Sequence, residues 1–156
     1  MFRRFARNTK PVRSHADAVA ARCGGGYDFW TVHVRDSPEK LAELNKLRLP
    51  GLNAYVQHLP PSATRVLWQT ASPSAFAHMT DYAKSHPTMR FCFTNFSRHT
   101  EDVWGGRNAS MVDESGITGA VNGELGRRGK GLVSLQSSLW TNFLSMLNPS
   151  MHIIPV

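Results

Sequence analysis

The two cysteines, Cys23 and Cys92, are the strongest nucleophiles in the sequence, and they stand far apart with no Cys-x-x-Cys pair. Two cysteines spaced in this way predict neither a disulfide framework nor a zinc ribbon. Cys92 lies between two phenylalanines in an apolar run, and no neighbouring residue in that run would activate its thiol. We therefore expect Cys92 to be a buried structural cysteine rather than a catalytic one.

The histidines and glycines of the sequence match neither a metal site nor a phosphate-binding loop. None of the seven histidines falls at a ligand spacing such as His-x-x-x-His. The stretches GGGYDF and GELGRRGKG lack the order Gly-x-x-x-x-Gly-Lys-Ser/Thr of a phosphate-binding loop. The sequence therefore predicts no catalytic residue, no metal, no cofactor and no small-molecule substrate.

Positive charge is concentrated in two places. Residues 1–26 contain six basic side chains and one acidic one, and GRRGKG near the C-terminus is the second cluster. Arginine and lysine beside glycine suit sequence-independent contact with RNA phosphates, although a solvated loop explains the second cluster equally well. The RNA-binding residues predicted from both clusters are Arg3, Arg4, Arg7, Lys10, Arg13, Arg127, Arg128 and Lys130.

The first 26 residues also suggest where the protein resides. They are rich in Arg and Ala and poor in acid, which is typical of a mitochondrial transit peptide. A basic arm that is retained is the alternative, and the sequence does not decide between them. No apolar run reaches the roughly 18 residues of a membrane-spanning helix. We expect a protein of the mitochondrial matrix without a transmembrane segment.

Alternating apolar residues predict strands at 27–34, 64–70 and 88–96. Ser37 and Pro38 are typical of a helix start, and that helix would continue to Leu59 with a break at Pro50. SAFAHMTDY (74–82) fits a helix and a strand equally well. SRHTEDVW (97–104) predicts the beginning of a further helix.

The composition changes after Gly105. Residues 105–131 are rich in glycine and have no apolar period, which predicts an extended or partly ordered segment. Residues 132–147 then place apolar side chains at helical intervals. This amphipathic helix would either fold back onto the core or bind a partner protein. We favour the partner, through Leu139, Trp140, Phe143 and Leu147.

The element order of residues 27–104 resembles the thioredoxin-like domain shared by several mitochondrial ribosomal proteins and by the small B8 accessory subunit of respiratory complex I. FWTVHV would be the first strand, TRVLWQT the second, and Ser72-Pro73 the turn. The resemblance implies that SAFAHMTDY is the third strand and TMRFCFTNF the fourth. The expected fold is therefore α/β, with a thioredoxin-like mixed four-stranded sheet and flanking helices, a basic N-terminal arm and a C-terminal extension ending in a helix. The expected divisions are 1–26, 27–104, 105–131 and 132–156.

The resemblance also implies a function. Redox chemistry in this fold needs thiols at the start of the first helix, where the sequence has RDSPEK instead. We therefore expect a protein that is not an enzyme. The first hypothesis is a structural subunit of the mitochondrial ribosome, of the large rather than the small subunit, which contacts rRNA and neighbouring ribosomal proteins. The alternative is an accessory subunit of complex I on its matrix arm, in contact with other subunits of that complex.

Overall fold

The computed structural model describes residues 10–34, 51–70, 72–94, 109–135 and 139–156. Five strands form one sheet in which every neighbouring pair is parallel, in the order β3-β2-β1-β4-β5. The chain thus begins the sheet at its centre, builds outward to β3, and then returns to add β4 and β5 on the other side. The strands are β1 (Trp30–His33), β2 (Arg65–Gln69), β3 (Arg90–Phe93), β4 (Gly131–Ser134) and β5 (His152–Pro155).

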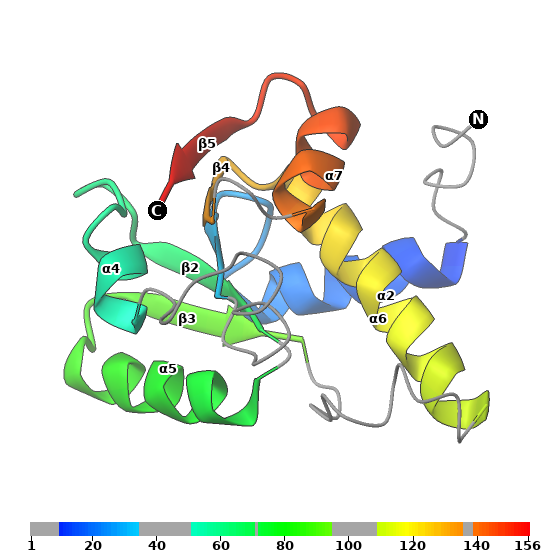
Figure 1. The fold of residues 1–156 in the computed structure, drawn as a ribbon, viewed down its shortest axis with the longest axis horizontal. Coiled ribbons are helices and arrows are strands. Elements are labelled where there is room, and N and C mark those ends of the chain that lie inside the picture. Colours follow the sequence, from blue (N-terminus) through cyan, green and yellow to red (C-terminus); the bar gives the residue numbers. More distant parts are fainter. Residues whose placement is uncertain (1–9, 35–50, 71, 95–108, 136–138) are drawn as a thin grey trace, which may run out of the picture.

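Helices cover both faces of this sheet (Figure 1). One face packs against α4 (Leu52–Val56) and α5 (Pro73–Ser85), and the other against α2 (Lys10–Arg22), α6 (Ala109–Arg128) and α7 (Leu139–Leu147). The architecture is therefore a doubly wound three-layer α/β fold, in which crossovers place the helices on alternate faces.

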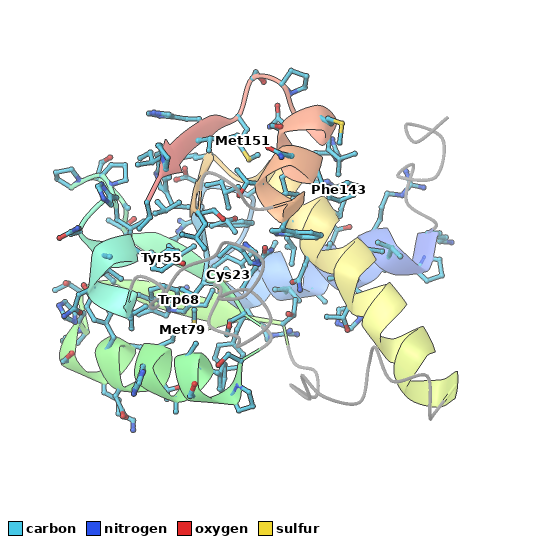
Figure 2. The ribbon with its side chains drawn as sticks, viewed as in Figure 1. Cys23, Tyr55, Trp68, Met79, Phe143 and Met151 are labelled. Carbon is cyan, nitrogen blue, oxygen red and sulfur yellow. A yellow bond between two sulfur atoms is a disulfide. The ribbon has the colours of Figure 1, made fainter. Side chains whose placement is uncertain are left out.

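The central strands β1, β2 and β4 are buried on both faces almost throughout, as parallel strands between two layers of helices are, whereas the edge strands β3 and β5 are partly exposed. On the α4–α5 face, Trp68 packs in one cluster with Tyr55 and Met79, as Figure 2 shows. On the other face, Leu67 and Cys92 pack with residues of α2 and α6. A third cluster joins Leu132 and Met151 to Leu144 of α7, also on this second face.

The expected α/β class is confirmed, but the mixed four-stranded thioredoxin-like sheet is wrong. The sheet has five strands and all are parallel, because residues 131–134 and 152–155 pair as β4 and β5. Sequence analysis had assigned the first of these to a helix and the second to a tail. In both strands, GLVS and HIIP, the two large apolar residues are adjacent, so no alternation of apolar and polar residues marks them in the sequence.

The stretch SAFAHMTDY is not a third strand but part of α5. The side chain of Ser72 caps this helix by accepting a hydrogen bond from the backbone nitrogen of Ala75 at 3.2 Å, and Pro73 occupies the first turn. Ala75 and Met79 are buried one helical turn apart, which places the apolar face of the helix on the sheet. The apparent alternation in this stretch was a coincidence of helical spacing.

Residues 109–128 of the supposedly extended glycine-rich segment form the helix α6. Two of its glycines face α7 at close range. A Cβ added at Gly126 would lie 2.8 Å from Leu144 Cδ1, and one at Gly123 would lie 3.3 Å from Phe143 Cε1. Glycine is present here because the two helices approach closely, and this packing overrides its low helix propensity.

The expectation of no disulfide is also wrong, because Cys23 and Cys92 are bonded with their Cα atoms 5.3 Å apart. Cys23 follows the last residue of α2, and Cys92 lies in β3 on the face that α2 covers. Their separation in the sequence gave no sign of this, since only the sheet brings β3 beside the end of α2. α2 packs on the sheet through Ala16, Val19 and Ala20 and shares a core with it.

Candidate functional site

Polar side chains form a row across the sheet at the carboxyl ends of its central strands. His33, Gln69 and Ser134 are in register on β1, β2 and β4, and they lie on the face that α6 and α7 cover. All three are buried. The strand order reverses between β1 and β4, and ligands of open α/β sheets bind outside the carboxyl ends of the strands at such a point. The row is therefore the candidate site.

Ser134 connects His33 to α7. Its Oγ lies 3.2 Å from His33 Nδ1 and 2.9 Å from Thr141 Oγ1, and Thr141 Oγ1 lies 3.0 Å from the backbone oxygen of Leu135. His33, Ser134 and Thr141 thus form a continuous chain of side-chain contacts from β1 to α7. This arrangement fixes the orientation of the ring at the end of β1.

Gln69 joins the same edge to both covering helices. Its Nε2 donates to the backbone oxygen of Asn122 on α6 at 3.0 Å, and its Oε1 accepts from Trp140 Nε1 on α7 at 3.0 Å. Thr94, which follows β3, donates to Asn122 Oδ1 at 3.1 Å. The network therefore fixes the carboxyl ends of β2 and β3 relative to the helices α6 and α7.

The N-terminus of α5 lies at the same edge, directly after β2. Thr70 Oγ1 accepts from the backbone nitrogen of Ser72 at 3.1 Å, and Ser72 caps the helix. The first turn contains no acidic residue. The partial positive charge of the helix N-terminus is thus not offset locally and favours an anion. Together with His33, it gives this edge the character of a site for an anionic ligand.

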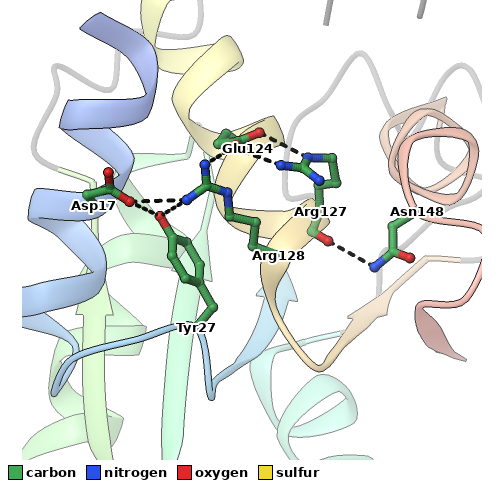
Figure 3. A network of polar contacts seen from close by, with 6 residues as sticks. All are labelled: Asp17, Tyr27, Glu124, Arg127, Arg128 and Asn148. Carbon is green, nitrogen blue, oxygen red and sulfur yellow. Dashed lines mark hydrogen bonds and ion pairs between the residues drawn. The ribbon is translucent and has the colours of Figure 1, made fainter. Parts of the chain in front are cut away.

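A second network lies at the end of α6, between α2 and α7 (Figure 3). Arg128 donates to Asp17 Oδ1 at 3.1 Å and to the Tyr27 hydroxyl, and its guanidinium lies 4.6 Å above the Tyr27 ring. Tyr27 itself donates to Asp17. Arg127 makes two hydrogen bonds to Glu124, at 3.0 and 2.9 Å. The network connects α2, the residues before β1 and α6.

Hydrogen bonds, burial and charges shift the pKa values of four members of this network, Asp17, Tyr27, Glu124 and Arg127. The hydrogen bond from Tyr27 is the largest cause of the lowered pKa of Asp17. Burial, followed by the hydrogen bond to Asp17, raises the pKa of Tyr27 to about 12. Burial opposes ionisation of Glu124, yet the hydrogen bonds and charges of Arg127 and Arg128 outweigh it and lower the pKa of this carboxyl.

The residues predicted to bind RNA fall into three groups. Arg3, Arg4 and Arg7 lie outside the described residues, and Lys10 and Arg13 are exposed on α2. Arg127 and Arg128 pair with Glu124, whose side chain is 1% exposed, and Lys130 pairs with Asp28. Much of the positive charge of GRRGKG is thus neutralised within the chain. RNA contact by these residues stays an untested prediction.

The residues predicted to bind a partner lie on α7, which folds back onto the sheet. Trp140, Phe143 and Leu147 pack against the cluster of Leu132, Leu144 and Met151. The side chain of Leu139 lies outside the described residues. The apolar side of this helix is therefore used within the chain at these three positions, and contact with a partner stays a prediction.

Sequence analysis did not find the polar row. Its members stand singly at the ends of three strands, and only a parallel sheet in known register brings them together. The sequence signal for it was a polar residue near the end of each apolar run, as in His33 and Gln69.

Within the described ranges, no group of three aspartate, glutamate, histidine or cysteine side chains is placed to bind a metal ion. None of the helices in these ranges is long and apolar enough to cross a membrane.

No protein-family model matches the chain, and its sequence matches no curated protein. Its fold, however, matches solved structures of NodZ, an α-1,6-fucosyltransferase. The crystal structure co-crystallised with GDP has a TM-score of 0.60 and 18% identity, and that soaked with GDP-fucose has a TM-score of 0.62 and 18% identity. The structure of fucosyltransferase NodZ from Bradyrhizobium has a TM-score of 0.61. Each match covers 94% of this chain and 44% of the NodZ chain, so this chain spans less than half of NodZ.

These comparisons correct the functional expectations. These solved structures are all of a fucosyltransferase, and none of them is a thioredoxin-like, ribosomal or complex I protein. The hypotheses of a structural subunit of the mitochondrial ribosome and of a complex I accessory subunit are therefore wrong. The expectation of a non-catalytic protein is wrong for the same reason, because the structural neighbours are enzymes. The matrix location stays an untested prediction.

Proposed function

We propose that this chain is a nucleotide-binding domain of the glycosyltransferase kind, which binds a nucleoside diphosphate or its sugar derivative at the carboxyl edge of the sheet. The observation that carries this proposal is the polar row of His33, Gln69 and Ser134 at the point where the strand order reverses. GDP is the first ligand to test, because NodZ structures with the same fold were obtained with GDP and GDP-fucose.

A diphosphate suits this edge for electrostatic reasons. Its negative charges are favoured by the N-terminus of α5, whose first turn contains no carboxylate. His33 lies at this edge beside Ser134, with its ring held in place at the end of β1. Gln69 and Asn122 hold each other and Trp140 in place, so the edge is ordered by the fold rather than by the ligand.

The reaction class follows from the same ligand. In glycosyl transfer, the bond between the anomeric carbon of the donor sugar and the diphosphate oxygen breaks. The oxygen of an acceptor hydroxyl forms the new glycosidic bond and loses its proton, and the nucleoside diphosphate leaves with the bonding electrons. Donors at the edge of the sheet would stabilise the charge that develops on the leaving diphosphate. We propose that this chain contributes that part of the reaction.

Isothermal titration calorimetry with GDP tests the proposal directly. We expect saturable binding by the full chain, and weakening of about tenfold in His33→Ala, the effect of losing one hydrogen bond to a charged group. His78→Ala is the matched control, because His78 is exposed on α5 and has no role at the edge. His33→Gln keeps a polar side chain at this position and serves as a second variant if His33→Ala does not fold. Circular dichroism shows whether each variant is folded.

Two results would contradict this function. The first is an absence of heat change with GDP at millimolar concentration for a chain that circular dichroism shows to be folded. The second is equal binding by the wild-type chain, His33→Ala and His33→Gln, which would place the nucleotide elsewhere. Titration of ADP, UDP and CDP in parallel then identifies the base that the site prefers.

A further inference from the structure

We propose that the amino edge of the sheet contains a second anion site, in which Arg65 and Arg90 bind one phosphate or sulfate group beside Gly24. This site lies at the opposite ends of the strands from the proposed nucleotide site. It is formed by other residues, and the two proposals can therefore fail independently.

The two arginines converge on one point of the backbone. Arg65 begins β2 and Arg90 begins β3, and they are direct partners in the parallel register. A Cβ added at Gly24 would lie 2.8 Å from Arg90 Nη1 and 3.3 Å from Arg65 Nε. Both guanidinium groups thus reach the same place beside the glycine loop that follows α2.

Neither arginine forms an ion pair with a carboxylate in the described part of the chain. Asp28 is paired with Lys130, whose hydrogen bond is the largest cause of the lowered pKa of this carboxyl, and the charge of Arg65 makes a smaller contribution. Asp17 and Glu124 are engaged by Arg127 and Arg128. Like charges on directly opposed residues of neighbouring strands destabilise a sheet, so this pair of cations costs stability until an anion lies between them.

The end of α2 does not use these cations as helix caps. The carbonyl oxygens of Val19, Ala20 and Ala21 accept from the backbone nitrogens of Cys23, Gly25 and Gly24. This pattern is a Schellman motif, with Gly24 in a left-handed conformation at a φ of 107°. The side chain of Arg65 donates one hydrogen bond, to the Gly25 oxygen at 2.8 Å, and that of Arg90 donates none to the described residues.

An oxyanion is the ligand that this geometry fits. A guanidinium presents several N–H groups in a planar fork, which matches two oxygens of a phosphate or sulfate. Because Gly24 has no side chain, both arginine side chains can lie directly against this loop, where a Cβ would clash with Arg90 Nη1. The disulfide holds the site together, because Cys23 precedes Gly24 and Cys92 lies two residues after Arg90 on the same face.

The test is a titration of the ¹⁵N-labelled full chain with sodium phosphate and, separately, sodium sulfate, with sodium chloride at matched ionic strength as the reference. We expect saturable chemical-shift changes of the amides of Gly24, Gly25 and Gly26 with at least one of the two oxyanions and not with chloride. Tighter binding of phosphate indicates a phosphate ester as the natural ligand group, and tighter binding of sulfate indicates a sulfate ester.

Variants separate a shaped site from diffuse charge. Arg90→Gln and Arg65→Gln should each weaken binding about tenfold, the loss of one charge-assisted contact. Lys10→Gln removes the same charge at the far end of α2 and should change the affinity less than about twofold. Arg90→Lys keeps the charge but lacks the planar guanidinium, so it should weaken oxyanion binding less than Arg90→Gln and more than Lys10→Gln.

Three outcomes would overturn the proposal, each judged on a chain whose spectrum shows that it is folded. The loop amides fail to respond to either oxyanion, chloride at equal ionic strength produces the same response, or Lys10→Gln weakens binding as much as Arg90→Gln. Loss of GDP binding in the same arginine variants would point to a single anion site rather than two.

Discussion

Cys23 and Cys92 are separated by 69 residues in the sequence, and their disulfide connects the end of α2 to the edge strand β3. Both cysteines are buried, with 1% and 6% of their surfaces exposed. The bond therefore joins the first described helix to the part of the sheet that is built from the middle of the chain. It restricts the unfolded chain over a long loop, and disulfides that close long loops stabilise proteins most in the entropic model.

The first prediction concerns this bond. Replacing both cysteines by serine should lower the free energy of unfolding by about 3–4 kcal/mol, because the unfolded chain regains the entropy of a loop of this length. Urea denaturation followed by circular dichroism measures the change. Dithiothreitol should shift the wild-type midpoint toward that of the variant and leave the variant where it is. A wild-type midpoint that does not respond to the reductant would count against a stabilising disulfide.

The second prediction compares two glycines. A Cβ at Gly131 would lie 2.7 Å from the backbone oxygen of His152 and 2.7 Å from Trp30 Cη2, whereas one at Gly119 would meet nothing within 4 Å. Gly131→Ala should therefore destabilise the protein by about 2 kcal/mol or more, since β1, β4 and β5 must shift apart. Gly119→Ala should stabilise it by up to about 1 kcal/mol through helix propensity. Thermal unfolding of the two variants should move the midpoint in opposite directions, and a shift of the same sign in both would refute the argument.

The third prediction is a dependence of stability on pH from Glu124. The pKa of this carboxyl is lower in the folded protein than its ordinary value of 4.5, so the unfolded chain binds more protons in this range. The contribution of Glu124 is therefore fully present above about pH 4.5, and it is lost as the pH falls through the lower folded pKa. The free energy of unfolding should decrease in acid below this value.

Glu124→Gln checks the assignment of that acid loss. The variant should lose about 2 kcal/mol at neutral pH, less than the roughly 3–5 kcal/mol for one partner of a fully buried pair, because Arg127 and Arg128 are 38% and 24% exposed. Its stability should also change less between pH 5 and acid than that of the wild type (about one titrating group fewer). Asp81→Asn, which breaks the exposed pair with Lys84, is the control and should stay within about 0.5 kcal/mol of the wild type. Equal acid sensitivity of the wild type and Glu124→Gln would exclude Glu124 as the cause.

The fourth prediction concerns the contact between Gln69 and α7. Trp140→Phe keeps the ring packing of α7 but removes the N–H that donates to Gln69 Oε1. The free energy of unfolding should fall by about 1–2 kcal/mol, because the buried oxygen of Gln69 loses its donor. In the Gln69→Met background the same change should cost much less, since no oxygen remains to be left without a donor. Denaturant unfolding of the four proteins measures the coupling. Strictly additive effects would show that the bond does not hold the helix.

Sequence reasoning located three of the strands, at 27–34, 64–70 and 88–96, because their apolar and β-branched residues carry a local signal. It missed β4 and β5, in which the large apolar residues are adjacent rather than alternating, and it assigned α5 to a strand. In α5 the local signals were in fact present, with Ser72 as the cap and Pro73 in the first turn. The implied thioredoxin-like topology overrode them, and that resemblance was the source of the error.

What the sequence by itself determined are properties that depend on neighbours along the chain: the α/β class, the apolar central strands, and the amphipathic segment that became α7. Tertiary structure alone decided the strand order, the Cys23–Cys92 bond and the row of His33, Gln69 and Ser134. The physical reason is that pairing of parallel strands connects residues separated by long crossovers. The residue types indicate whether each position is buried or exposed, but they do not indicate which distant strand lies beside it.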